Sequence, residues 1–513
     1  MLVPAVVPAA AAMERKVFTM SVLDEQAAAD RTSAPPPRMS KRQRAVLLLL
    51  LGSTFLLAAD LSLLNVAIPL IGDGLGFTVG NLQWIATAFA LTAAGLTLLF
   101  GRVADLFGRR RVFAGGMLLL VLSSLLGGVA QEPWVLIAAR VGQGVATAMS
   151  TPAALALLTT SFPEGPLRAK ALGANGAMVS AGFTVGAVVG GVLTDLLSWR
   201  WAFLINVPVG AVIALLVPVL LTESKAAAGG RMDVPGAVTV TLGLGGAVYG
   251  ISRAGDLGWT SPAVLGCLGA GLLLLVVFWR IELRAAHPLA SVGILRKPTV
   301  RWGNIGGFAT ITMQTAVIFL VTLYLQEVLG YSPMATGLAF AVIGVAAFLG
   351  GMAAPRLIHR FGSRAGLLTG MLLQAAGPTG LFLTAAEDSS IAVTLAILAV
   401  GAFGHVTAVV SYMVTATSGL PDGEQGLATG LATMTQQVAL AVGIPLMSSL
   451  ATGRMHALEA THTTAQSVLA GVRIAMAADA VIVLATVILI TVFLRRTPAA
   501  NANDALPPVP LTH

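Results

Sequence analysis

The stretch GRVADLFGRRR, residues 101–111, interrupts a chain that is otherwise poor in charge. It holds four arginines, one aspartate and two glycines, whereas only 10% of the 513 residues are charged. Hydrophobic residues make up 56% of the chain, and its mean hydropathy is +0.88. A chain of this composition cannot form a water-soluble surface, so lipid must surround most of it. The charged stretch therefore marks a place where the chain leaves the membrane.

On both sides of this stretch the sequence is divided into apolar runs. A helix that crosses a bilayer needs roughly 20 mostly apolar residues, and fourteen runs qualify. They lie near residues 45–71, 81–101, 112–130, 134–159, 169–194, 201–222, 234–252, 262–280, 301–325, 335–354, 364–385, 390–416, 426–451 and 473–495. Backbone groups cannot stay unpaired in hydrocarbon, and strands of a membrane barrel would be shorter and would alternate. The sequence predicts an all-α polytopic membrane protein with about 14 transmembrane helices.

The basic residues predict the orientation. If the N-terminus is cytoplasmic, cytoplasmic segments hold 25 of the 30 Lys and Arg residues, external loops hold 4, and Arg140 lies inside the membrane. Membrane proteins concentrate Lys and Arg in cytoplasmic loops, so we expect both termini in the cytosol of a multi-pass cell-membrane protein. This placement also accounts for the net charge of +8 without nucleic acid as a partner.

The ends of the chain and its single cysteine add four expectations. Residues 1–44 are polar and rich in Pro and Ala, so we expect a disordered cytoplasmic tail, and residues 496–513 are expected to form a second tail. The apolar run after residue 44 is too long for a secretory signal. Cys267 is the only cysteine, so no internal disulfide can form.

An internal repeat predicts how the helices are divided. When residues 101–110 are shifted by 254 positions, they align with PRLIHRFGSR, residues 355–364, and four residue types coincide. Transporters are often built from parallel six-helix repeats. We therefore expect a six-helix half at 45–222, two inserted helices with a linker at 223–300, and a second half at 301–495. The alternative is a chance similarity of short basic loops.

The charged stretch is similar to the loop signature G-x-L-A-D-R-x-G-R-[KR]-[RK] of the major facilitator superfamily. The matching residues are Gly101, Ala104, Asp105, Gly108, Arg109 and Arg110. Leu106 departs from the signature, where a basic residue is usual. Asp105 ends a helix, where the helix dipole disfavours negative charge, so it needs an arginine or another helix N-terminus as a partner. Such a contact is a candidate conformational latch, and flanking charge that merely sets topology is the alternative.

The fourth run carries an arginine inside the membrane. In LIAARVGQGVATA, residues 136–148, Arg140 lies about seven residues into an apolar helix, at a cost of roughly 2.5–3.5 kcal/mol. Its R-x-x-Q-G spacing, with Gln143 and Gly144, resembles the helix 4 motif of proton antiporters in this superfamily. A buried partner is one expectation, and an arginine that extends to the outer interface is the other.

The first run supplies a carboxylate at a comparable depth. AADLSLLNVAIPLI, residues 58–71, places Asp60 roughly 22 Å from the inner end of its helix. The pattern of Asp60, Asn65, Val66, Ala67 and Pro69 resembles the helix 1 signature of fourteen-helix drug:proton antiporters. Desolvation and a nearby cation act in opposite directions on a carboxylate, so an Asp60–Arg140 pair can switch its proton affinity when helices move. A purely structural ion pair is the alternative.

The fifth run has a stripe of glycines. Gly182, Gly186 and Gly190 recur every fourth residue, which permits close helix packing. With Gly191, they resemble the exporter signature G-x-x-x-G-P-x-x-G-G, although Ala187 stands where proline is expected. Close packing alone also explains these glycines.

Other residues are candidates for a second proton site and for a substrate cavity. Asp479 in the last run is either a further protonation site or a carboxylate solvated at the outer interface. The residues proposed to line a mixed polar and apolar cavity are Asn65, Gln143, Gln314, Tyr324 and Gln437. The sequence has no G-x-x-x-x-G-K-[ST] motif for ATP, and we identify no cofactor, metal site or catalytic nucleophile.

The resemblance implies a proton-coupled secondary transporter, not an enzyme, that exports small, often lipophilic drug-like molecules or secondary metabolites by alternating access. Its expected partners are the substrate, protons and lipid, and we expect a monomer. Ala187 keeps open an importer or symporter of the same fold. A membrane sensor without transport activity is a further alternative.

Overall fold

The computed structural model describes residues 39–78, 81–162, 166–225, 233–285, 292–420 and 422–494, and these residues form helices and no strand. The first helices are α2 (Lys41–Leu75), α3 (Gln83–Phe107), α4 (Arg109–Gly128), α5 (Pro133–Ser161), α6 (Pro166–Leu196), α7 (Trp201–Leu204) and α8 (Asn206–Leu220). The next are α9 (Val234–Leu257), α10 (Pro262–Glu282), η2 (Val292–Arg296), α11 (Pro298–Leu323) and η3 (Tyr324–Val328). The last are α12 (Pro333–Phe361), α13 (Ser363–Thr384), α14 (Ile391–Thr417), α15 (Asp422–Leu458) and α16 (Thr464–Phe493).

Most of these helices can cross a membrane. Twelve helices in the described ranges are long and apolar enough, and α3, which bends by 50° between Thr97 and Leu99, makes a thirteenth. The all-α polytopic fold is therefore confirmed. The remaining predicted run coincides with α9, a helix of 24 residues that falls outside this set, so the total of fourteen crossings stays a prediction.

The start of the first long helix differs from the expected boundary. We expected an irregular tail up to residue 44, but α2 begins at Lys41. Ser40 caps the helix because its hydroxyl accepts from the backbone N–H of Gln43, whose side chain accepts from the backbone of Ser40 in return. The predicted tails 1–38 and 496–513 lie outside the described residues.

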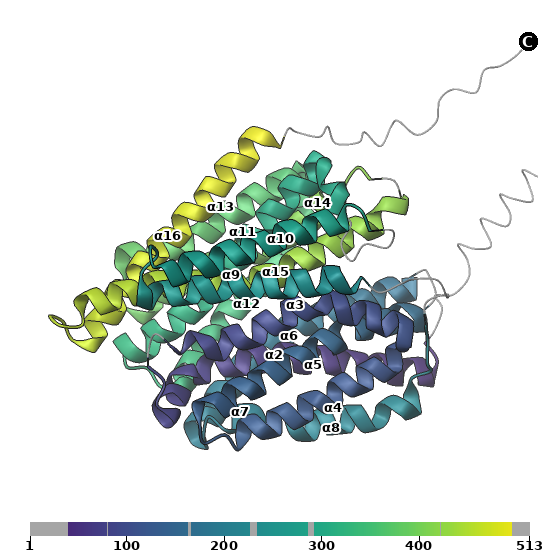
Figure 1. The fold of residues 1–513 in the computed structure, drawn as a ribbon, viewed down its shortest axis with the longest axis horizontal. Helices are drawn as coiled ribbons and strands as arrows, with labels where there is room; N and C mark the ends of the chain where they lie inside the picture. The colour runs from purple at the N-terminus through teal and green to yellow at the C-terminus, as the bar shows by residue number, and fades with distance from the viewer. Residues whose placement is uncertain are drawn as a thin grey trace, which may run out of the picture.

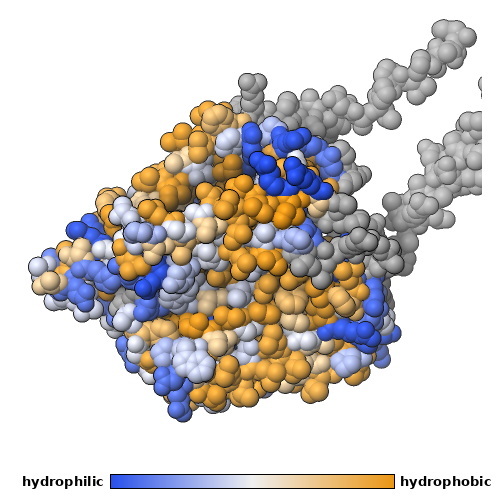
Figure 2. Space-filling model, viewed as in Figure 1, coloured by the Kyte–Doolittle hydropathy of each residue, from blue (hydrophilic) through white to orange (hydrophobic). Residues whose placement is uncertain are grey.

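The helices form two packed sets (Figure 1). Within the first set, α2 packs on α6, α3 on α5, and α4 on both α5 and α8; within the second, α13 packs on α14 and α16, and α11 on α14 and α15. The pair α9–α10 lies at the seam, since α9 contacts both α3 and α15. Hydrophobic residues cover much of the visible surface, and hydrophilic ones gather towards its ends, as expected of a surface that faces lipid (Figure 2).

The two sets share an apolar core near the C-terminal end of α2. Leu63 and Ile71, in the second half of α2, belong to the same buried cluster as Leu320 of α11. Residues of the first half of α2, such as Leu49, belong to a separate cluster with Phe113 and other members of the first set. The sets are thus sealed against each other near the C-terminal end of α2.

Candidate functional site

The buried polar site is centred on Asp60, which lies in the middle of α2 and is 1% exposed. Its Oδ1 atom accepts hydrogen bonds from Gln143 Nε2, at 3.0 Å, and from Asn206 Nδ2. Its Oδ2 atom lies 3.5 Å from Nη1 of Arg140. The carboxylate therefore has neutral and cationic donors from α5 and α8 within the apolar interior.

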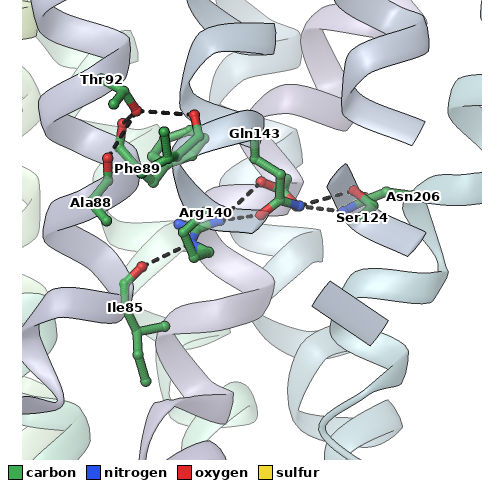
Figure 3. A network of polar contacts seen from close by, with 10 residues as sticks. Ile85, Ala88, Phe89, Thr92, Ser124, Arg140, Gln143 and Asn206 are labelled. Carbon is green, nitrogen blue, oxygen red and sulfur yellow. Dashed lines mark hydrogen bonds and ion pairs between the residues drawn. The ribbon is translucent and has the colours of Figure 1, made fainter. Parts of the chain in front are cut away.

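Arg140 contacts a backbone oxygen, a side-chain amide and an aromatic ring in addition to Asp60. It is 1% exposed, and its Nε donates to the backbone oxygen of Ile85 at 2.8 Å. Its Nη1 donates to Oε1 of Gln143 at 2.8 Å, and its guanidinium lies 4.4 Å from the centre of the Phe89 ring (Figure 3). This burial excludes an arginine that extends to the outer interface. The predicted pairing with Asp60 is present.

Gln143 connects the two charges. Its Oε1 accepts from Arg140, and its Nε2 donates both to Asp60 and to Oγ of Ser124 in α4, the latter at 2.9 Å (Figure 3). The network thus joins α2, α3, α4, α5 and α8. Because charged groups out of water depend on the donors around them, a shift of one of these helices would alter the proton affinity of Asp60.

The charged loop forms contacts within the first set of helices. Arg109 donates to Oδ1 of Asp105 through Nε at 2.9 Å and Nη2 at 2.8 Å, so the partner that Asp105 needs is the neighbouring arginine. The carboxylate of Glu223 accepts from the backbone N–H of Arg110 at 3.0 Å and lies 3.7 Å from Arg111. A carboxylate is stabilised at this position because the N-terminus of a helix carries partial positive charge.

The repeated loops have matching geometry. Gly108 separates α3 from α4 with φ 118°, and Gly362 separates α12 from α13 with φ 84°. Arg110 Nη1 donates to the backbone oxygen of Leu221, after α8, and Arg364 Nε donates to that of Leu494, after α16. Equivalent arginines thus bind the end of the last helix of each set, which argues against a chance similarity of the two loops.

The glycine stripe of α6 packs directly on backbone. A Cβ atom on Gly182, Gly186 or Gly190 would lie 2.5–2.7 Å from a backbone oxygen of α2, namely that of Phe55, Ala59 or Leu63. Gly191 faces the other way, against the backbone of Pro333 in α12, and Gly337 of α12 faces the backbone oxygen of Ala187. These glycines therefore hold α6 close to one helix of each set.

Asp479 of α16 is a second carboxylate that the described residues bury completely. It is 0% exposed, and neither of its oxygens has a hydrogen-bond partner in the described part of the chain. The alternative of a carboxylate solvated at the outer interface is therefore wrong. The structure does not bring Asp479 into the network of Asp60.

The residues suggested for a cavity lie in different places. Gln314 lines an enclosed cavity of about 20 Å³, with room for one water molecule. Gln437 Nε2 lies 3.4 Å from Thr97 Oγ1 of α3, between the two sets, and Asn65 is buried in α2. Tyr324 is fully buried, and its hydroxyl donates to the backbone oxygen of Ala386 at 2.9 Å. We therefore leave Tyr324 out of the proposed cavity and assign Gln143 to the network around Asp60.

Sequence reasoning missed three polar members of these contacts. In the sequence, Asn206 and Ser124 look like ordinary polar residues of apolar helices. Glu223 lies beyond its helix, where no periodicity marks it.

Comparison with known proteins decides the family. The sequence profile of the Major Facilitator Superfamily matches residues 50–444. The chain belongs to this superfamily. It is 37% identical over 464 residues to the puromycin resistance protein pur8 of Streptomyces alboniger, covering 88% of this chain and 91% of that protein. It is 36% identical over 397 residues to the cephamycin export protein CmcT of Amycolatopsis lactamdurans, covering 77% and 82%.

A solved structure agrees on the fold of this superfamily member. The bacterial homologue of the human lysosomal transporter Spinster, in an inward-facing and unoccupied conformation, matches with a TM-score of 0.64 at 17% identity, over 90% of this chain and all of that one. The family match and these relatives, together with the membrane-spanning helices, show that the chain is a multi-pass membrane transporter with small-molecule substrates, not an enzyme.

Proposed function

We propose that this transporter exports antibiotics or other drug-like metabolites in exchange for protons. The names of its relatives, a puromycin resistance protein and a cephamycin export protein, support the substrate class. The carboxylate of Asp60, buried with Arg140, Gln143 and Asn206, supports the coupling to protons. This buried network is the observation that carries the proposal.

Coupling requires that Asp60 gain and lose a proton in different conformations. With Arg140 and two amide donors in place, the ionised carboxylate is stabilised. If α5 or α8 moves away, Asp60 loses donors and takes up a proton instead. Proton binding and helix movement then favour each other, which is the linkage that an antiporter needs.

Asp479 is proposed as a second proton site. Its carboxylate is completely buried, and neither oxygen has a hydrogen-bond partner among the described residues. We infer that its protonation changes when water or a cationic substrate reaches it.

Alternating access would use the halves 45–222 and 301–495, with 223–300 inserted between them. Asp105 is proposed to exchange Arg109 for a partner in the second half when the conformation changes, which is how the loop would serve as a latch. Both termini are proposed to lie in the cytosol of the cell membrane, and the functional unit is proposed to be a monomer.

The experiment is a flux measurement in proteoliposomes with puromycin, a cephamycin and a chemically diverse panel. We expect an imposed pH gradient to drive uphill movement of at least one compound, with proton movement in the opposite direction. Inverted membrane vesicles give the direction: efflux from cells appears as uptake into them. Movement in the other direction would favour an importer of the same fold.

A further inference from the structure

A lateral groove lies where the inserted pair meets the second half. It has a volume of about 570 Å³ and lies between the end of α10, η2, the start of α11 and α15. The lining residues are Trp279, Leu283, Gly293, Leu295, Arg296, Arg301, Asn304, Ile305, Phe308 and Thr435. None of them belongs to the network around Asp60.

The groove has two cations without carboxylate partners. Arg296 and Arg301 are exposed, and neither forms an ion pair within the described ranges. Their neighbour Lys297 differs, because it is paired with Glu424 of α15. Arg301 also lies 5.3 Å from the centre of the Trp302 ring, a contact that leaves its N–H groups available. Two guanidiniums without an ion-pair partner in the described residues attract an anion, and guanidinium geometry suits phosphate oxygens.

The polar groups deeper in the groove already have partners. Asn304 Nδ2 donates to the backbone oxygen of Val300 at 2.8 Å, and Asn304 Oδ1 accepts from Thr435 Oγ1 at 2.8 Å. An incoming anion would therefore find its donors on the two arginines.

The remaining wall is apolar and partly exposed. Trp279 is 41% exposed, Leu283 46% and Ile305 37%. A free phosphate ion would make no use of these side chains. A molecule with an anionic head and hydrocarbon chains satisfies both the cations and the apolar wall.

We propose that this groove binds an anionic phospholipid from the surrounding leaflet. Its phosphate group lies between Arg296 and Arg301, and its acyl chains follow Trp279, Leu283 and Ile305 outwards. A lipid in this position contacts α10 and α11 together, so it stabilises the attachment of the inserted helices to the second half. This inference does not depend on the transported substrate or on proton coupling.

The test compares lipid-dependent stabilisation of the full-length transporter in detergent. Phosphatidylglycerol or phosphatidylcholine is titrated while the midpoint of thermal unfolding is followed. The groove variant is Arg296→Gln/Arg301→Gln. The matched control is Arg280→Gln/Arg284→Gln, which removes two exposed arginines from the same end of α10 that do not line the groove.

We expect phosphatidylglycerol to raise the unfolding midpoint of the wild type and of the control variant. The groove variant should need at least about tenfold more of this lipid for the same rise, equivalent to a loss of about 1.4 kcal/mol in binding. Phosphatidylcholine should raise the unfolding midpoint only slightly, and by the same amount in all three proteins.

Three results would overturn the proposal. The first is equal loss of the phosphatidylglycerol effect in both double variants, which would indicate net charge alone. The second is stabilisation of the wild type by soluble glycerol phosphate to the same extent as by the lipid, which would indicate a small-anion site. The third is an undiminished effect in the groove variant. A separate measurement, native mass spectrometry of retained phosphatidylglycerol, distinguishes weaker binding from general misfolding of a variant.

Discussion

Arg140 Nη1 lies 3.5 Å from Oδ2 of Asp60, although both side chains are almost completely buried. Two hydrogen bonds through Gln143 are shorter than this distance. Arg140 donates to Gln143 at 2.8 Å, and Gln143 donates to Asp60 at 3.0 Å. The carboxylate is thus bound mainly through amides, with the cation at a longer distance. A movement of α5 or α8 would therefore change the hydrogen bonds of Asp60 as well as its distance from Arg140.

Asp60→Asn should abolish pH-gradient-driven transport. The amide cannot titrate, so proton movement would no longer accompany that of the substrate, whereas binding of a neutral compound should persist. Flux and proton release in proteoliposomes measure both effects. Asp73→Asn, an exposed position on the same helix, is the control and should remain coupled. Coupled flux in the Asp60 variant would leave Asp479 as the candidate and reduce the pair to a structural role.

Arg140→Leu should lower stability by about 3–5 kcal/mol, because removal of one buried partner leaves the other uncompensated. The midpoint of thermal unfolding in detergent reports the change. Arg253→Leu breaks a more exposed pair with Asp256 and should change stability by about 0–1 kcal/mol. Adding Asp60→Asn to Arg140→Leu should recover part of the loss. A double variant that is simply additive would contradict an energetic link between the two residues.

Gly186→Ala should destabilise the protein by about 1–3 kcal/mol and slow transport, because overpacking forces the backbone apart. The new Cβ would lie 2.7 Å from the backbone oxygen of Ala59. Gly176→Ala is the matched control on the same helix, since nothing lies within 4 Å of its added Cβ. Unfolding midpoints and initial rates are compared. Equal behaviour of the two variants would mean that α2 and α6 do not need this close approach.

The variants Gly108→Ala and Gly362→Ala, in equivalent loops, separate the cost of a positive φ from the cost of a steric collision. Both positions have positive φ, so alanine should cost about 1–3 kcal/mol in either loop. Only at Gly108 would the Cβ also collide with the carboxylate of Glu223, at 2.7 Å. The Gly108 variant should therefore be the less stable of the two in thermal unfolding. The reverse order would exclude a structural role for Glu223 at the start of α4.

The orientation can be tested with single cysteines after Cys267→Ser. Ala285→Cys should be labelled by an impermeant maleimide only from the cytosolic side, and Leu458→Cys only from outside. The expectation rests on the distribution of 25 cytoplasmic and 4 external basic residues. Labelling of both positions from the same side would contradict it.

The sequence was sufficient to predict the helices and the pairing of Asp60 with Arg140. The length of an apolar run predicts a membrane span. Because an unpaired charge in lipid is costly, Asp60 and Arg140, which lie at similar depths, are expected to pair. The sequence did not predict neutral partners such as Asn206, because an asparagine in a helix carries no signal of which neighbour it will face. Burial of Asp479 was equally open, because depth along one helix does not reveal which side of it other helices cover.

The contact of α6 with α12 has a consequence for how such exporters diversify. Gly191 meets the backbone of Pro333, and Gly337 meets that of Ala187, so at these two positions α6 and α12 approach each other through main-chain atoms. Main-chain atoms are the same whatever the residue, so this contact between α6 and α12 requires small residues at these positions. Side chains that select a substrate can be replaced elsewhere in the protein without changing this contact between α6 and α12. The named relatives, a puromycin resistance protein and a cephamycin export protein, are examples of such divergence in substrate.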